Sequence, residues 1–278
     1  MFFRLSLIVF AMNVCFDLAL LRAARAEEDL QIKEGVTLYS KGDSDGLVGA
    51  YQQPRWTTAR LFSGTRSYLI PKNSLETEFW FTMKNHRDGA GSEFFFQQEI
   101  EAGLIDHVQL DVYINEIKSQ DQAFALEGAQ LEIRYAFADW GKIFLNPTLY
   151  FEYHPRRGAP DRAEVRLLLS ETLAPSWHWA ANLAAESELS GALIHEYALT
   201  TGVGRALFES RLSLGLEGKA VWVDAALNRG AFDKEYYLGP SAQWKFHPRM
   251  HVELTGFAGL NHGADAFQST LILGADLR

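Results

Sequence analysis

Hydrophobic and polar residues alternate along most of this chain, from residue 75 to its end. The stretch from Lys142 to Tyr153 shows the pattern: Ile, Leu, Pro, Leu, Phe and Tyr occupy the odd positions from 143 to 153. Asn, Thr, Tyr and Glu occupy the even positions from 146 to 152. A period of two residues is typical of a β-strand with one apolar and one polar face. We therefore predict a chain made almost entirely of such strands.

The alternating stretches and the turn-rich breaks between them predict about twelve strands. Longer breaks follow the odd-numbered strands and shorter breaks follow most of the even-numbered ones, which places both ends of the chain on the same side of the structure. The predicted strands are 75–84, 92–102, 107–117, 123–138, 142–153, 162–172, 177–188, 193–203, 206–223, 235–246, 250–260 and 267–277.

One face of each predicted strand is apolar and the other carries polar and charged residues. Along residues 107–115, for example, valine, leucine and isoleucine alternate with glutamine, aspartate and asparagine. A membrane barrel has such an apolar outer face, with aromatic residues near the strand ends. Aromatic residues at these places are Trp140, Tyr153, Trp177, Tyr197, Trp222, Tyr236, Trp244 and Phe267.

Composition narrows the fold class further. Apolar residues make up 47% of the chain, yet beyond residue 26 no run approaches the 18 or so needed for a membrane-spanning helix. Strands that cross a bilayer must form a closed barrel, because an open sheet edge would leave backbone groups without partners in lipid. We predict an all-β fold with one antiparallel transmembrane barrel at 74–278. A secreted β-sandwich also alternates, but its strands average nearer five or six residues.

The first 26 residues have the features of a secretory signal peptide. Arg4 precedes a mainly apolar run from Leu5 to Leu21, and Ala24-Arg25-Ala26 provides small residues before an acidic segment. We predict cleavage after Ala26, with an N-terminal membrane anchor as the alternative. The only cysteine, Cys15, lies in this segment, so the mature chain would contain no thiol, disulfide or acyl anchor.

Residues 27–73 differ from the rest of the chain. Glycine, aspartate and serine at 42–46 form a turn-rich break, and Pro54 and Pro71 interrupt short apolar runs. We expect an N-terminal extension that either lies in the periplasm or folds into the barrel mouth as a plug. A poorly ordered tail is the alternative, although Trp56, Phe62 and Tyr68 make the segment more apolar than such tails usually are.

The chain is acidic. Its formal net charge is −9, and residues 1–26 contribute +2 from three arginines and one aspartate, which leaves −11 for the remainder. Such a surface argues against nucleic acid as a partner. The predicted inward faces also hold more acidic than basic residues. The acidic residues include Glu76, Glu78, Glu99 and Glu101 near the start of the barrel.

These inward charges are the candidate functional residues. They either pair as arginine–carboxylate networks that hold opposite walls together, or they leave unpaired glutamates as a negative constriction that favours cations. We expect Arg134, Arg166 and Arg211 to project inward at middle depth. The full predicted set is Glu132, Arg134, Glu152, Glu164, Arg166, Glu186, Glu196, Arg211, Glu217, Lys245 and Glu253.

Signals of catalysis or of a bound cofactor are weak. The sequence has no nucleophile-elbow motif, no paired-histidine zinc motif, no cysteine metal site and no glycine-rich phosphate loop, and we predict no cofactor and no metal. His247 and His251 flank a predicted turn, where a histidine pair is more often solvated than metal-bound. Barrel phospholipases use a serine and a histidine on neighbouring outward positions. His178 or His195 with a nearby serine is an alternative of this kind, and no spacing favours one over the other.

Together these features resemble a small Gram-negative outer-membrane β-barrel of about twelve strands. The resemblance implies an outer-membrane location, contact with outer-membrane lipid, and insertion by the barrel-assembly machinery. Such proteins commonly end in an aromatic residue, whereas this sequence ends in Leu277 and Arg278. We expect a narrow or partly plugged channel or transporter for small solutes. The alternatives are a closed barrel with a structural, adhesive or lipid-acting enzymatic role, or a secreted soluble protein that binds a ligand.

Overall fold

The computed structural model describes residues 47–58, 60–87, 89, 91–119, 123–208 and 211–277. The expected signal peptide and residues 27–46 of the extension lie outside the described residues. No helix among the described residues is both long enough and apolar enough to cross a membrane.

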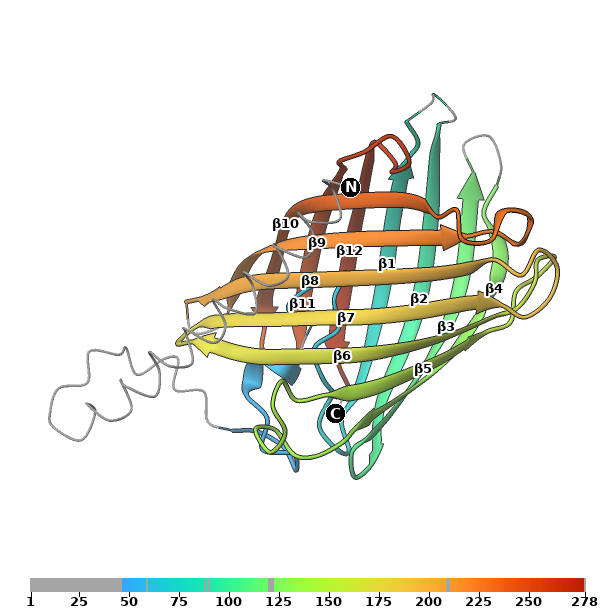
Figure 1. The fold of residues 1–278 in the computed structure, drawn as a ribbon. Coiled ribbons are helices and arrows are strands. Elements are labelled where there is room, and N and C mark those ends of the chain that lie inside the picture. The colour runs from blue at the N-terminus through green and yellow to red at the C-terminus, as the bar shows by residue number, and fades with distance from the viewer. Residues whose placement is uncertain are drawn as a thin grey trace, which may run out of the picture.

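The described chain forms a closed antiparallel barrel of twelve strands (Figure 1). Each strand pairs with its neighbours in sequence, and β1 pairs with β12 to close the barrel, so no sheet edge is left open. The strands are β1 (Leu75–Asn85), β2 (Ser92–Ile105), β3 (Val108–Ser119), β4 (Ala125–Ala136), β5 (Thr148–His154), β6 (Arg162–Ala174), β7 (Trp177–Glu188), β8 (His195–Leu207), β9 (Leu212–Asp224), β10 (Asp233–His247), β11 (Met250–Gly259) and β12 (Phe267–Asp276). Two short 3₁₀ helices, η1 (Arg55–Thr58) and η2 (Ala226–Asn228), lie outside the sheet.

The all-β class, the closed barrel and the strand number are confirmed, but two strand boundaries are wrong. The fifth strand begins at Thr148 rather than at residue 142. Leu145 and Asn146 adopt positive φ angles, and Pro147 has no N–H to give to a neighbouring strand, so the alternating pattern here does not continue as a strand. β8 ends at Leu207 and β9 begins at Leu212, whereas the sequence placed the break at 204–205, so β8 is longer and β9 shorter than predicted.

The connections divide into two groups. At the mouth where β1 begins and β12 ends, which we call the proximal mouth, two residues join β2 to β3 and two join β10 to β11. The connection from β4 to β5 at 137–147 is the exception at this mouth. At the opposite, distal mouth the connections are longer, as between β5 and β6 at 155–161.

The two faces of the strands differ as the alternation predicts. The outer face exposes large apolar side chains, such as Val112, Ile114, Leu214 and Leu216. The opposite face of the same strands buries polar residues, among them Asp111 and Glu217. A continuous apolar outer surface on a closed barrel matches the hydrocarbon layer of a bilayer.

Most of the predicted belt aromatics lie on this outer surface, but Trp140 does not. Trp177, Tyr197, Trp244 and Phe267 are exposed. Trp140 instead packs edge-on against Trp56 and Tyr68 of the N-terminal segment, with ring centroids 5.7 and 5.3 Å away. The β4–β5 connection that carries Trp140 is held to this segment by the Trp140 N–H, which donates to the Tyr51 carbonyl.

Residues 47–58 and 60–74, which we call the lumen segment, lie in the interior of the barrel and at its proximal mouth. The segment forms hydrogen bonds with β1, β2, β3, β6, β7, β9, β10 and β11, and its large apolar side chains from Tyr51 to Ile70 are buried. In a closed barrel, only a segment in the interior can contact walls on all sides.

The outer face generates a direct prediction. Leu214→Arg and Leu167→Arg each place a cation on the apolar surface, which costs about 2–4 kcal/mol near mid-bilayer. We expect both variants to fold into lipid vesicles in lower yield than the unmutated protein, measured by heat-modifiable migration, while Leu214→Ala and Leu167→Ala fold normally. Unchanged yield for both arginine variants would show that the assigned faces are reversed.

Candidate functional site: an acidic ladder in the lumen

Carboxylate side chains form a continuous row across nine neighbouring strands. In the strand register each member lies directly opposite the next, so all of them face the same side of the sheet. From β12 through β1 to β8, the row consists of Asp276, Glu76, Glu101, Asp111, Glu132, Glu152, Glu164, Glu186 and Glu196. We call this row the acidic ladder.

The ladder runs from one mouth of the barrel to the other. Asp276 is the last residue of β12 and Glu76 is the second of β1, both at the proximal mouth. Glu196 is the second residue of β8, at the distal mouth. Strands of a barrel tilt against its axis, so a row perpendicular to the strands climbs along the lumen as it passes around the wall.

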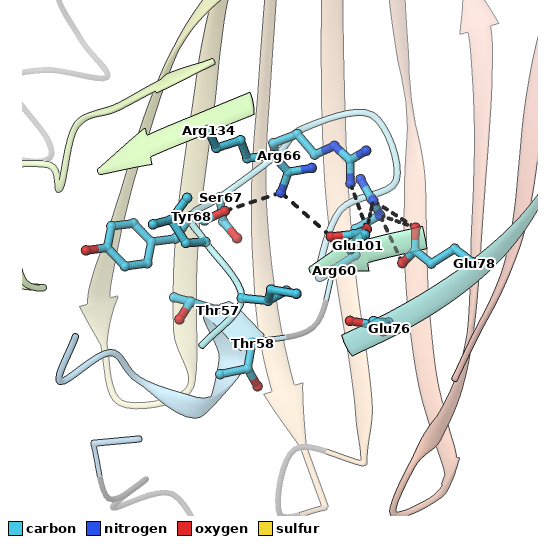
Figure 2. Close-up of a pocket in the computed structure, with 12 residues that line it drawn as sticks. Thr57, Thr58, Arg60, Arg66, Ser67, Tyr68, Glu76, Glu78, Glu101 and Arg134 are labelled. Carbon is cyan, nitrogen blue, oxygen red and sulfur yellow. Dashed lines mark hydrogen bonds and ion pairs between the residues drawn. The ribbon is translucent and has the colours of Figure 1, made fainter. Parts of the chain in front are cut away.

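Like charges directly opposite each other destabilise a sheet, so the ladder requires compensating cations. The lumen segment supplies two (Figure 2). Arg60 Nη2 lies 2.8 Å from Glu78 Oε2 and 3.0 Å from Glu101 Oε1. Arg66 Nη2 lies 3.2 Å from Glu99 Oε1 and 3.8 Å from Glu132 Oε2.

Arginines of the barrel wall supply the other cations. Arg134 Nη2 lies 2.9 Å from Asp111 Oδ2, and Arg134 Nε donates a hydrogen bond to Glu132. Arg166 binds Glu164 through two hydrogen bonds of 2.5 and 2.6 Å. Nearer the distal mouth, Arg162 Nη1 lies 2.8 Å from Glu186 Oε1.

Tyr150 separates the two central wall arginines. Its ring centroid is 5.9 Å from the Arg134 guanidinium carbon and 4.5 Å from that of Arg166, and its hydroxyl donates to Glu152. An aromatic face attracts a cation, so Tyr150 keeps both guanidinium groups beside the ladder.

The backbone of the lumen segment is held by side chains of the wall. Asn182 accepts a hydrogen bond from the Arg66 N–H and donates one to the Arg66 carbonyl, at 2.8 and 2.7 Å. Glu217 accepts from the Gly64 N–H at 3.0 Å, and Gln109 accepts from the Ile70 N–H at 2.7 Å. These contacts fix the position of Arg66 in the lumen.

The wall opposite the charged cluster has small residues that make room for Phe62. A Cβ atom added to Gly202 would lie 2.7 Å from the Phe62 ring, and one added to Gly204 or Gly215 would lie 3.1 or 3.2 Å from it. The ring also packs in a buried cluster with Trp56, Leu61 and Ala180. One side of the lumen segment is therefore anchored by apolar packing and the other by ion pairs.

Little empty space remains around the cluster. A cavity of about 30 Å³ is bordered by Arg60, Arg66, Glu76, Glu101 and Arg134, among others. One water molecule needs roughly 10–15 Å³ by this measure, so the cavity could hold about two waters and is too small for a larger solute. At the proximal mouth, Lys72 Nζ donates a 2.9 Å hydrogen bond to Asp106, which lowers the pKa of that carboxyl.

The structure brings together most of the residues proposed from the sequence. Glu132, Arg134, Glu152, Glu164 and Arg166 are neighbours in or beside the ladder. Glu186 and Glu196 extend the ladder, Glu217 holds the lumen segment, and Glu253 is buried on β11. Lys245 is half-buried near the end of β10.

Arg211 differs from the expectation of an inward position at middle depth. It lies in the turn before β9 and is exposed. The turn falls later in the chain than the predicted boundary, which removes Arg211 from the strand.

Arg60 and Arg66 were missed as site residues because the lumen segment has no strand pattern from which to assign a face. The usable signal was charge balance, since the inward carboxylates outnumber the inward wall cations. The segment contains Arg55, Arg60, Arg66 and Lys72 and no carboxylate, so its cations could have been matched to that excess.

The histidines have different environments. His251 is buried and faces the lumen, whereas His247 is exposed at the end of β10. His178 stacks on Trp56, with ring centroids 4.6 Å apart. His195 Nδ1 lies 2.8 Å from Ser187 Oγ, and this pair is on the outward side near the distal mouth, directly across from Asp224 on β9.

Comparison with solved structures agrees with this architecture. An outer-membrane channel from Pseudomonas putida F1 has a TM-score of 0.56 and 9% identity, and the match covers 76% of this chain and 98% of the channel. The KdgM porin has a TM-score of 0.52 and 7% identity over 73% of this chain and 99% of the porin. The NanC porin has a TM-score of 0.51 and 10% identity over the same shares of the two chains.

The chain has the fold of a small outer-membrane β-barrel. No protein-family model matches the sequence, and no curated protein matches it either. At these identities the likeness is one of fold, so the functional argument depends on the residues of the lumen.

The ion pairs of the ladder predict that replacing Arg134 lowers the stability of the barrel more than replacing Arg166 does. Removing Arg134, whose side chain is 4% exposed, leaves the buried Asp111 without its cation and Glu132 with Arg66 alone. We expect a loss of about 3–5 kcal/mol in the free energy of unfolding. Arg166 is 26% exposed, so water can replace part of its contact with Glu164. We expect Arg134→Ala to be clearly less stable than Arg166→Ala in urea unfolding from vesicles. Equal stability of both variants and the unmutated barrel would contradict a filled lumen.

Proposed function

We propose that the protein is an outer-membrane channel for small, positively charged solutes, and that the lumen segment restricts it. The acidic ladder is the observation that carries this proposal. Rings of carboxylates favour cations in pores, and here the carboxylates follow one another from the proximal to the distal mouth. The outward apolar surface and the fold support the outer membrane as its location.

The lumen segment sets the conductance in this proposal. Arg60 and Arg66 pair with Glu101 and Glu132 of the ladder, and the adjoining cavity is too small for a solute larger than water. The segment continues directly into β1 at Ser74. It is otherwise held by side-chain contacts, ion pairs, packing and a few backbone hydrogen bonds, such as that from the Asn73 N–H to the Gly103 carbonyl. Passage of a solute therefore requires displacement of the segment.

Planar-bilayer recordings of Arg60→Ala/Arg66→Ala test the channel proposal. The two substitutions remove the cations that tie the segment to β1, β2 and β4, so we expect a several-fold higher conductance than in the unmutated protein. The reversal potential in a KCl gradient should indicate preference for K⁺.

The matched control is Arg55→Ala/Lys72→Ala, which removes the same charge from the same segment. Arg55 is exposed and Lys72 pairs with Asp106 at the mouth, so conductance should stay low. A large, steady conductance of the unmutated protein would refute the restriction, and preference for Cl⁻ in the double variant would refute the role of the ladder.

A second candidate function is lipid hydrolysis, favoured by the hydrogen bond between Ser187 and His195. A serine activated by a histidine is the nucleophile of many ester hydrolases, and this pair faces outward at the edge of the apolar surface. The neighbouring Asp224, however, accepts from the Gly230 N–H and lies 3.4 Å from Arg229. The carboxylate is thus bound by groups other than the histidine.

Phospholipid hydrolysis in mixed micelles distinguishes this second function from the first. If the pair is catalytic, the unmutated protein releases fatty acid, and Ser187→Ala lowers the rate at least a hundredfold while Ser190→Ala does not. Equal rates for the unmutated protein and Ser187→Ala would assign the pair a structural role.

A further inference from the structure

His251 reaches across one strand of the barrel to contact carboxylates on the next. It is on β11, and its direct neighbour on β12 is Gly274, which in turn lies opposite Glu78 on β1. A Cβ atom at Gly274 would lie 2.1 Å from the His251 ring. The imidazole can therefore occupy this position only because residue 274 has no side chain.

The ring is surrounded by three carboxylates. His251 Nδ1 lies 3.6 Å from Glu76 Oε1, and Nε2 lies 3.5 Å from Glu78 Oε1 and 3.6 Å from Glu253 Oε1. One ligand atom each from Glu76, Glu78 and His251 can be chosen so that all lie within 4.8 Å of one another. Two ligands that share one ion at about 2.0–2.2 Å lie roughly 3.3–3.6 Å apart in tetrahedral geometry. The separation of 3.5 Å between His251 Nε2 and Glu78 Oε1 fits this spacing.

Several of these buried atoms have no hydrogen-bond partner among the described residues. They are Nε2 of His251, Oε1 of Glu76 and Oε2 of Glu253, in residues that are 3%, 4% and 1% exposed. Buried polar atoms are rarely left without a partner, because their desolvation costs free energy. The unpartnered imidazole nitrogen is an observation independent of the carboxylates, and it points to a missing ligand.

Charge balance indicates the sign of that ligand. Arg60 pairs with Glu78, but within the part of the chain that the structure describes no arginine or lysine forms an ion pair with Glu76 or Glu253. The small cavity beside the cluster is bordered by Glu76 and Glu78, which leaves room next to the ligand atoms. A cation would satisfy both the charge and the unpartnered atoms.

We propose that Glu76, Glu78 and His251 bind a divalent transition-metal ion on the barrel wall, with Zn²⁺ as the best match. Imidazole is a good ligand for Zn²⁺ and a poor one for Mg²⁺ and Ca²⁺, which prefer oxygen ligands only. The nitrogen that would bind the ion is Nε2, because it has no hydrogen-bond partner within the described part of the chain and lies 3.5 Å from Glu78 Oε1. The site joins β11 to β1 across β12, next to the pairing that closes the barrel.

Zinc binding to the full-length barrel in detergent tests the site. After removal of metal with a chelator, the unmutated protein should bind one Zn²⁺ per chain in calorimetry and should unfold at a higher temperature with Zn²⁺ than without it. Neither Ca²⁺ nor Mg²⁺ should compete. Absence of Zn²⁺ binding by the folded unmutated protein would overturn the proposal.

Two variants remove the site in different ways. His251→Ala deletes a ligand, whereas Gly274→Ala keeps every ligand and displaces the ring, and each should weaken Zn²⁺ binding at least tenfold. His247→Ala changes an exposed histidine at the neighbouring turn and should bind as the unmutated protein does. Heat-modifiable migration shows which variants are folded. If either variant does not fold, Glu76→Gln is used in its place to remove a ligand. Unmutated affinity in the folded His251 or Gly274 variant would contradict the assignment.

Discussion

The interior of this barrel depends on ion pairs between arginines and the carboxylates of the acidic ladder. Carboxylates directly opposite one another on nine strands repel each other, and burial removes the water that would screen them. Arg134, Arg162 and Arg166 compensate from the wall, and Arg60 and Arg66 compensate from the lumen segment. Part of the charge that the barrel needs is therefore supplied by a segment that is not itself a strand.

This arrangement relates the fold to the proposed function. The same carboxylates that attract the arginines of the lumen segment would attract cationic solutes once the segment is displaced. A barrel with a neutral interior would have no electrostatic reason to hold the segment, and a lumen compensated entirely by its own wall would not need it. The apolar contact of Phe62 with Gly202 and Gly204 holds the opposite side of the segment without affecting this charge balance.

Strand positions and faces could be predicted because alternation is a local property that each strand shows by itself. The β4–β5 connection could not, since Leu145 and Asn146 continue the alternating pattern while their backbone turns away from the sheet. The ladder depends on register between strands, which tight turns set: Glu101 and Asp111 are opposed because the short β2–β3 turn fixes their pairing. The partners of Arg60 and Arg66 depend on where the lumen segment lies, and no local pattern specifies that position.

The central claim is that the lumen segment occupies the lumen of the folded barrel. An engineered disulfide between this segment and the barrel wall tests that claim most directly. Ser63 and Thr255 are hydrogen-bonded through their side chains, and the chain's only cysteine is at position 15, so a pair introduced at 63 and 255 can be followed without interference from others in the barrel. We predict that Ser63→Cys/Thr255→Cys cross-links rapidly in the membrane under mild oxidation, whereas Ser63→Cys/Ser187→Cys, with its second cysteine on the outer face, does not. Failure of the first pair to cross-link in folded barrels, or equal cross-linking of both pairs, would contradict the account.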